Sequence, residues 1–304
     1  YYASRGLGDV YKRQMRDIKR RKSSIQSTQQ ITKAMKLVST VKLQRARQNA
    51  EKSEDYFHAM YSTVQSILGR TGSLEHRYLK PGEGGKKAVI VITSNRGLAG
   101  GYNSNVVKLI TRGELKDEDL SIYAIGKKGK EALQKNYEIK ADYSYVIEEP
   151  AYADAMAISK EVLSAFENGE ISEIYLAYTG FKNTVVHVPT LVKLLPVEVS
   201  EETSGKTGEV VKEAEDDNRA PMNFEPEDEE ALDMIIPKYV TSLIYGGMIE
   251  AVASENGARM QAMDSATSNA EDMISSLSLL YNRARQGSIT QELTEIIAGA
   301  NAIS

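Results

Sequence analysis

The sequence predicts an α/β protein with a coiled coil: the two chain termini form an antiparallel two-helix coiled coil, and a central open α/β sheet domain of Rossmann-like type lies between them in the sequence. Residues 15–68 contain neither Gly nor Pro, and residues 238–304 contain no Pro. Both ends therefore lack the residues that normally interrupt helices in a globular chain. The middle alternates short β-rich runs with helical stretches, a pattern typical of a mostly parallel sheet covered by helices.

The first long helix is expected over residues 15–70. Residues 1–14 contain glycines and aromatic residues without a helical period. We expect them to be a gene-assembly artefact or a disordered leader, with a short targeting peptide as the alternative. Within the helix, apolar residues recur along one side and predict the face that packs on the second long helix. These residues are Ile18, Ile25, Ile31, Met35, Val38 and Val41.

The central domain is expected over residues 86–200. Three β-rich runs predict strands, and stretches between and after them predict helices. The strands are expected at residues 88–92, 121–125 and 174–178, and the helices at residues 103–110, 127–134 and 153–166. Residues 185–195 predict one further strand, which Pro189 confines to an edge of the sheet because proline cannot donate a ladder hydrogen bond.

The second long helix is expected over residues 237–304, after an acidic loop at residues 201–236. Steps of four and three residues from Ile249 define a heptad seam whose side chains are small and mixed. The seam consists of Ile249, Ala253, Asn256, Met260, Met263, Thr267, Ala270, Ile274, Leu277, Tyr281 and Ala284. Such a seam lets two helices approach closely but buries little apolar area, so we expect the pair to depend on something wrapped around it. Two ordinary surface helices are the alternative.

Charge is divided unevenly along the chain, although the net charge is only −4. Residues 16–47 hold ten Lys or Arg and one acid, whereas residues 198–230 hold thirteen Asp or Glu and three bases. The basic segment needs an acidic partner or an acidic part of this same chain. A nucleic acid is the alternative partner, but the segment lacks interleaved aromatic residues and the acidic loop would repel a polyanion. We therefore expect no nucleic-acid binding.

No constellation of side chains predicts a catalytic, cofactor or metal site. The glycine-rich residues 93–103 follow a strand and open a helix, where doubly wound sheets bind phosphates. Their glycines do not match G-x-G-x-x-G, and Gly205-Lys206-Thr207 lacks the first glycine of a Walker motif. We expect the glycine turn to pack the sheet against a long helix, with a nucleotide-dependent enzyme as the alternative. Cysteine is absent, which excludes disulfides and thiolate metal sites.

Four ordered motifs resemble the gamma subunit of F-type ATP synthases. The segment Ile289-Thr-Gln-Glu-Leu-Thr-Glu-Ile-Ile-Ala-Gly-Ala-Asn-Ala302 is similar to the C-terminal signature of that family. Residues 31–38, 96–103 and 258–263 resemble its N-terminal helix, its central glycine turn and its C-terminal helix. The resemblance covers residues 15–304. Ala99 stands where many members have cysteine, and the cysteine pair of chloroplast members is absent, so thiol control should be missing.

The resemblance implies a central rotary shaft without catalytic activity, cofactor or small-molecule substrate of its own. In the family, one copy per complex turns inside a ring of alternating alpha and beta subunits. The central domain of the shaft contacts the epsilon subunit and the membrane ring of c subunits. Proton flow turns the c ring, and the shaft drives the catalytic sites through their states. The implied location is peripheral, on the cytoplasmic face of the bacterial cell membrane.

The resemblance also implies which residues contact the catalytic ring. Met35 and Lys36 match the segment that faces acidic lever loops of the catalytic subunits, and Arg259 lies in the opposing helix motif. The upper contact segment is matched by Arg285, Gln286, Thr290 and Glu292.

Overall fold

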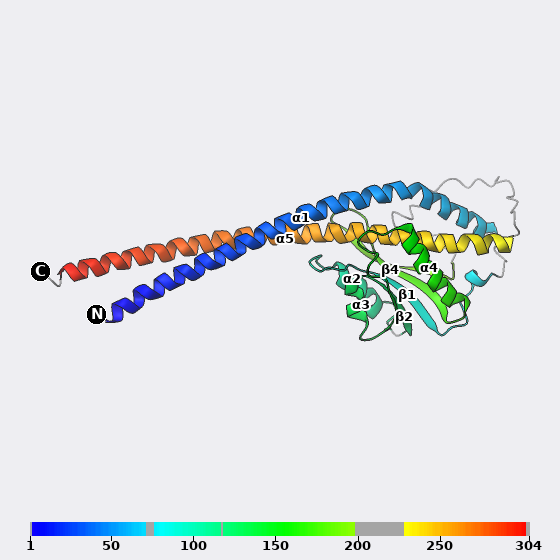
Figure 1. Ribbon diagram of the computed structural model, residues 1–304, viewed down its shortest axis with the longest axis horizontal. Coiled ribbons are helices and arrows are strands. Elements are labelled where there is room, and N and C mark those ends of the chain that lie inside the picture. Colours follow the sequence, from blue (N-terminus) through cyan, green and yellow to red (C-terminus); the bar gives the residue numbers. More distant parts are fainter. Residues whose placement is uncertain (1, 71–75, 117, 198–227, 302–304) are drawn as a thin grey trace. The chain divides into compact units, whose positions relative to one another are not determined.

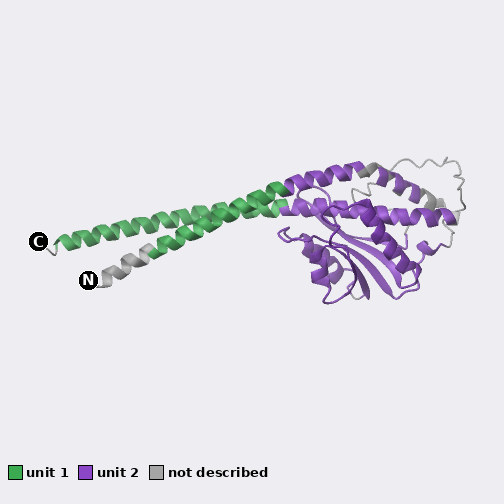
Figure 2. Cartoon of the chain, in the orientation of Figure 1, with its two compact units in different colours: residues 1–38, 260–304 green, residues 39–259 purple. Residues whose placement is uncertain are grey.

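The computed structural model describes residues 2–70, 76–116, 118–197 and 228–301. Two long helices, α1 (Tyr2–Arg70) and α5 (Asp228–Asn301), enclose the rest of the chain in sequence (Figure 1). The chain divides into two compact units (Figure 2), which we call the coil unit (residues 1–38 and 260–304) and the hub unit (residues 39–259). Each long helix contributes residues to both units.

The hub unit contains a five-stranded sheet in the order β3-β2-β1-β4-β5. The strands are β1 (Lys86–Ile92), β2 (Leu120–Ile125), β3 (Glu138–Asp142), β4 (Ile171–Phe181) and β5 (His187–Leu195). The first four strands are parallel, and β5 pairs antiparallel with β4 at the edge. The expected open sheet is confirmed, and so is the edge position of the strand that holds Pro189.

Strand β3 was not predicted from the sequence. Its residues Glu-Ile-Lys-Ala-Asp alternate between exposed charged side chains and half-buried apolar ones. The strand lies at the second edge of the sheet, and charged residues there have low intrinsic β propensity while discouraging pairing with other chains. The extended conformation of β3 therefore depends more on its pairing with β2 than on its own residue composition.

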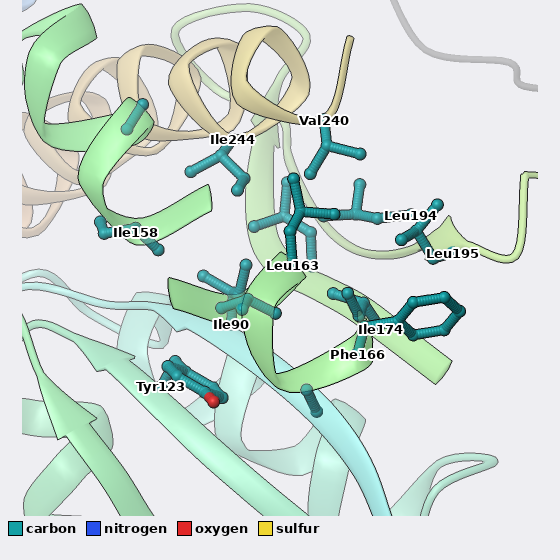
Figure 3. Packing of buried hydrophobic residues seen from close by; sticks show 14 of the residues in the cluster. Ile90, Tyr123, Ile158, Leu163, Phe166, Ile174, Leu194, Leu195, Val240 and Ile244 are labelled. Carbon is teal, nitrogen blue, oxygen red and sulfur yellow. The ribbon is translucent and has the colours of Figure 1, made fainter. Parts of the chain in front are cut away.

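Helices cover both faces of the sheet within the hub unit. Helices α2 (Tyr102–Arg112) and α3 (Lys127–Leu133) pack on one face, where Val89, Val91 and Ile122 are fully buried. On the other face, α4 (Tyr152–Glu167) and the first part of α5 enclose a larger cluster (Figure 3). Its labelled members Ile90, Ile158, Leu163, Val240 and Ile244 come from β1, α4 and α5 (Figure 3). This arrangement makes the sheet the centre of a three-layer hub.

Helix α5 begins earlier than predicted, at Asp228, and it contains Pro237. Residues 228–236, which we had placed in the acidic loop, are therefore helical, whereas residues 201–227 lie outside the described residues. Leu232, Ile236, Val240 and Ile244 recur every four residues and are fully buried in the hub core. Burial of this stripe offsets the lost hydrogen bond and the ring clash that a proline introduces into a helix. Tertiary packing thus overrides the local signal.

Helix α1 also begins earlier than predicted. It runs from Tyr2, so residues 2–14, for which we expected an artefact or a disordered leader, are helical. Short 3-10 helix η1 (Arg77–Leu79) precedes the sheet. His76 caps this turn by accepting a hydrogen bond from the Tyr78 amide at Nδ1, 3.3 Å away, and its Nε2 lies 3.1 Å from Asp233 Oδ1 of α5. The buried His76 thus has a structural role.

The heptad seam predicted on α5 is confirmed by burial. Its members are buried or half-buried along the whole stretch from Ile249 to Ala284, and Ser288 continues the pattern. The stripe predicted on α1 is wrong in part, because Ile31, Val38 and Val41 are more than half exposed. Between residues 18 and 50, the buried and half-buried positions of α1 other than Met35 instead follow steps of four and three residues, at Ile18, Lys22, Ile25, Gln29, Thr32, Lys36, Ser39, Leu43, Ala46 and Ala50.

Candidate functional site

Polar side chains join the two helices within the coil unit. Gln29 Nε2 donates to Glu271 Oε1 at 2.9 Å, and the Thr32 and Thr267 hydroxyl oxygens lie 2.8 Å apart. Lys36 Nζ forms an ion pair with Asp264 Oδ1. Steps of +3 and +4 on α1 match steps of −4 and −3 on α5, so the helices are antiparallel, as the sequence predicted. The seam residues of α1 between Gln29 and Ser39 are polar, which explains why the apolar pattern pointed to the wrong face in this stretch.

Met35 and Lys36, the two residues assigned to the lever-loop segment, are both half-buried on α1. The ammonium group of Lys36 is partly satisfied by Asp264 across the coil. The sequence analysis missed Asp264 as the partner of Lys36. The only signal that could have found it is the heptad phase of α1, which places Lys36 on the seam.

The side of α1 that faces away from the seam carries large apolar side chains. Ile31, Leu37 and Val38 are 60%, 63% and 58% exposed, and Lys33, one turn before Leu37, is exposed as well. A soluble chain rarely leaves several large apolar side chains together in water unless a partner covers them. Together with exposed lysine, they form a surface suited to a partner that offers both apolar and acidic groups.

The four residues assigned to the upper contact segment, Arg285, Gln286, Thr290 and Glu292, all lie on α5 in the coil unit. Their side chains are exposed. The same stretch exposes Ile289, Leu293, Ile296 and Ile297. Exposed apolar and polar side chains are thus distributed around this end of α5 rather than along one stripe. Such a distribution suits a helix that other chains contact on several sides.

Arg259, the remaining assigned residue, belongs to the hub unit and is 9% exposed. Its guanidinium donates to Glu255 Oε1 at 2.6 Å and to the Gly97 carbonyl at 3.5 Å. Burial raises the pKa of Glu255, and the neighbouring Arg259 opposes that rise. Arg259 is therefore turned toward the glycine turn of its own unit.

The glycine turn packs the sheet against α5, as expected. Tyr102, at the start of α2, is buried and donates its hydroxyl proton to the Ala251 carbonyl at 3.2 Å. Asn103 Oδ1 accepts from the Ser94 amide at 2.9 Å and closes the turn. Leu98 at the tip has φ of 62° and an exposed side chain. These hydrogen bonds of the turn thus join parts of the hub unit to one another.

Neither a metal centre nor a membrane span is evident in the part of the chain that the structure describes. Among those residues, no three His, Cys, Asp or Glu side chains lie close enough together to hold a metal ion. None of the described helices combines the length and the apolar character required to cross a bilayer.

Comparison with known proteins identifies the family. The family model described as ATP synthase matches residues 14–303. A chain described as ATP synthase gamma chain from Lachnoclostridium phytofermentans is 63% identical over 293 residues, which cover 95% of this chain and 99% of that protein. The chain belongs to the ATP synthase gamma-chain family. A further relative from Acetobacterium woodii, described as sodium ion specific, is 42% identical over 95% of this chain and 99% of its own length.

Membership in this family makes the chain a non-catalytic subunit of the central stalk of an F-type ATP synthase. Solved structures share the fold at low identity. A chain of the Euglena gracilis mitochondrial ATP synthase matches with a TM-score of 0.66 at 17% identity, covering 95% of this chain and 94% of that one. A chain from the central stalk and c ring of the Tetrahymena thermophila enzyme matches with a TM-score of 0.57 at 22% identity, covering 78% and 99%.

Proposed function

We propose that this chain is the rotating shaft that couples proton flow through a membrane c ring to ATP synthesis or hydrolysis in an alpha–beta ring. The observation that carries the proposal is the coil unit: it exposes large apolar side chains on both helices while joining the helices through polar contacts. Exposed apolar side chains of this kind mark a surface that other chains cover. The hub unit, with its own apolar core, is then the part that contacts the epsilon subunit and the c ring.

The shaft acts by offering different contacts to the catalytic sites as it turns. A ligand or partner shifts a conformational equilibrium only through its differential affinity for the states. The outer face of α1 exposes Ile31, Leu37 and Val38, and Lys33 is exposed one turn before Leu37. An asymmetric shaft with such a face presents a different surface to each catalytic site at any moment, which supports sequential rather than simultaneous changes of state.

Reconstitution tests the proposal directly. An alpha–beta ring is assembled with and without the purified full-length chain, and steady-state ATP hydrolysis is measured. We expect the chain alone to be inactive and to raise the turnover of the ring strongly. A chain that neither joins the ring nor changes its turnover would refute the proposal.

The proposed contact of Met35 with the acidic lever loops can be tested by introducing a positive charge at this position. Met35→Lys adds a cation beside the proposed acidic lever loops, so it should add an ionic contact that holds the shaft too long in one state. In membrane vesicles that carry the complete complex, we expect ATP-driven proton pumping to fall by a larger factor than ATP hydrolysis. The matched control, Met35→Leu, keeps the side chain apolar and should leave the ratio of pumping to hydrolysis unchanged. Equal losses of pumping and hydrolysis in Met35→Lys would count against this contact.

The exposed C-terminal segment is proposed as a second contact with the ring. Arg285, Gln286, Thr290 and Glu292 are exposed on α5, where polar groups can engage surrounding subunits at particular rotor angles. We further propose that the complete complex holds one copy of this chain and places it on the cytoplasmic face of the bacterial membrane. Removal of the peripheral complex from inside-out vesicles at low ionic strength should release the chain together with the alpha and beta subunits.

A further inference from the structure

The seam between the two helices of the coil unit lacks a continuous row of large apolar side chains, because a polar group interrupts it. In the part of the unit closest to residues 38 and 260, α1 contributes Gln29, Thr32 and Lys36, and α5 contributes Asp264, Thr267 and Glu271. Apolar seam residues flank this polar group on α1 at Ile18 and Ile25. On α5 they are Met263, Ala270, Ile274, Leu277 and Tyr281. Small and mixed apolar residues at heptad spacing pack almost equally well after a shift of seven residues, so they specify the register poorly.

We propose that the Thr32–Thr267 hydroxyl pair, supported by Lys36–Asp264 and Gln29–Glu271, is a register lock that holds the two helices of the shaft in one alignment. The hydroxyl oxygens are 2.8 Å apart, and Thr32 is buried. Thr267 also lies 2.7 Å from the Met263 carbonyl, and Thr32 lies 3.0 Å from the Gln29 carbonyl. Each hydroxyl has a single proton, so one hydroxyl donates across the seam while the other donates within its own helix.

Shifting α5 by seven residues along α1 shows which contact distinguishes the native alignment from the shifted ones. If α5 moves so that Thr32 faces Ile274, Lys36 faces Glu271 and keeps an acidic partner. If α5 moves the other way, Thr32 faces Met260. In both shifted alignments the Thr32 hydroxyl keeps its bond to the Gln29 carbonyl of its own helix, but it loses its partner across the seam and faces an apolar side chain, so each shift costs one buried hydrogen bond. The Lys36–Asp264 ion pair therefore disfavours at most one of the two shifted alignments, whereas the Thr32–Thr267 pair disfavours both.

A polar pair at a seam position is a known way to fix alignment at some cost in stability. For a shaft, alignment decides which outer side chains of α1 and α5 lie at the same height. Slippage of one helix along the other would dissipate an applied torque. Only this consequence rests on the proposed rotary function, because the lock itself is a property of the isolated chain.

Disulfide trapping tests the lock on the purified full-length chain. The chain contains no cysteine, so each engineered pair is the only pair present. Ile25→Cys with Ile274→Cys reports the native alignment, since these positions are one heptad from Thr32 and Thr267. Ile25→Cys with Tyr281→Cys and Ile18→Cys with Ile274→Cys report the two shifted alignments. In the otherwise unchanged chain, we expect mild oxidation to close only the first pair.

In the variant Thr32→Val/Thr267→Val, the yields of the two shifted disulfides should rise by about five- to tenfold relative to the native pair, the change expected for one lost buried hydrogen bond. The matched control is Thr28→Val, which replaces an exposed threonine of α1 outside the seam, and it should leave all three yields unchanged. A double-valine chain that still closes only the native pair would overturn the lock. Failure of the chain to stimulate an alpha–beta ring would refute the proposed function while leaving this result intact.

Discussion

The hub unit and the coil unit differ in how they use apolar side chains. In the hub, large branched side chains such as Ile90, Ile122 and Ile158 are fully buried between sheet and helices. In the coil, the seam mixes polar residues such as Thr32 with half-buried apolar ones such as Ile274, whereas Ile31 and Leu37 are exposed. Burial of apolar side chains therefore stabilises the hub by itself, whereas the coil leaves large apolar side chains exposed for contact with partners. A subunit that must be rigid in one unit and make changing contacts with the other needs this division.

The largest effect is expected where the hub backbone is tightest. Gly126 has φ of 112°, and a Cβ atom there would lie 2.1 Å from the Thr93 carbonyl oxygen. Gly126→Ala should lower the free energy of unfolding by about 3 kcal/mol or more, because both the backbone conformation and the space exclude a side chain. Urea denaturation followed by near-ultraviolet circular dichroism of the tyrosines measures the loss. Gly97→Ala is the matched control, since a Cβ atom there meets nothing within 4 Å, and it should cost about 1 kcal/mol at most.

Truncation of one isoleucine in each unit compares the two interiors directly. Ile90→Ala removes a fully buried side chain from the hub and should destabilise by about 3–4 kcal/mol. Ile274→Ala removes a half-buried seam residue from the coil and should cost only about 1 kcal/mol. The same urea titration measures both, with helix content at 222 nm added for the coil. Equal losses would show that the coil has an interior comparable to that of the hub.

An ion network on the hub sheet predicts a pH dependence. Lys193 and Lys87 lie 3.0 and 3.2 Å from the Glu173 carboxylate, and the Tyr175 hydroxyl donates to it at 2.9 Å. Burial raises the pKa of Glu173, but the hydrogen bonds from Lys193, Tyr175 and Lys87 outweigh it and leave the pKa below its ordinary value of 4.5. A lowered folded pKa stabilises the protein above pH 4.5, and this contribution disappears as the pH falls below 4.5.

Replacement of this carboxylate isolates its contribution. Glu173→Gln should destabilise the hub by about 1 kcal/mol at pH 7 and by clearly less at pH 3. Free energies of unfolding from urea titrations of both proteins at the two pH values give the difference. Glu131→Gln, at an exposed pair with Lys128 on α3, serves as the control for a carboxylate outside the network. An equal loss at both pH values would exclude charge as the reason for the effect.

The smallest effect on stability is expected on the outer face of the coil. Val38→Ser exchanges a side chain that is 58% exposed, so it should change the free energy of unfolding of the isolated chain by less than about 0.5 kcal/mol. It should nevertheless weaken assembly with an alpha–beta ring, measured by co-elution in size-exclusion chromatography. A marked loss of stability without a change in assembly would reverse the roles assigned to the two units.

Most of the hub could be predicted because its signals are local. The runs that became β1, β2 and β4 are rich in Val, Ile and Tyr, and the stretches that became α2, α3 and α4 separate them. Strand β3 escaped because its charged residues suit an edge rather than an interior. The start of α5 escaped because Pro237 is a strong local stop signal, and only burial of Leu232 and Ile236 in the hub core overrides it.

The contact residues were predictable only through resemblance to a family. Lys36 and Arg259 look alike as isolated basic residues in a sequence. In the structure, Lys36 pairs across the coil with Asp264, whereas Arg259 is buried against Glu255 and Gly97. A charge has no preferred partner until the fold brings an opposite charge within a few ångströms. Sequence reasoning could name these residues but could not assign their partners.

The sequence by itself determined two long helices, a mostly parallel sheet and a heptad seam on α5, because helix breakers and hydrophobic periods act over a few residues. Only the tertiary structure decided which side of α1 meets α5. Apolar counting favoured Ile31 and Val38, yet the seam holds Gln29, Thr32 and Lys36. The physical reason is that Glu271, Thr267 and Asp264 of α5 offer Gln29, Thr32 and Lys36 polar partners across the coil. That pairing becomes visible only when both helices are in place.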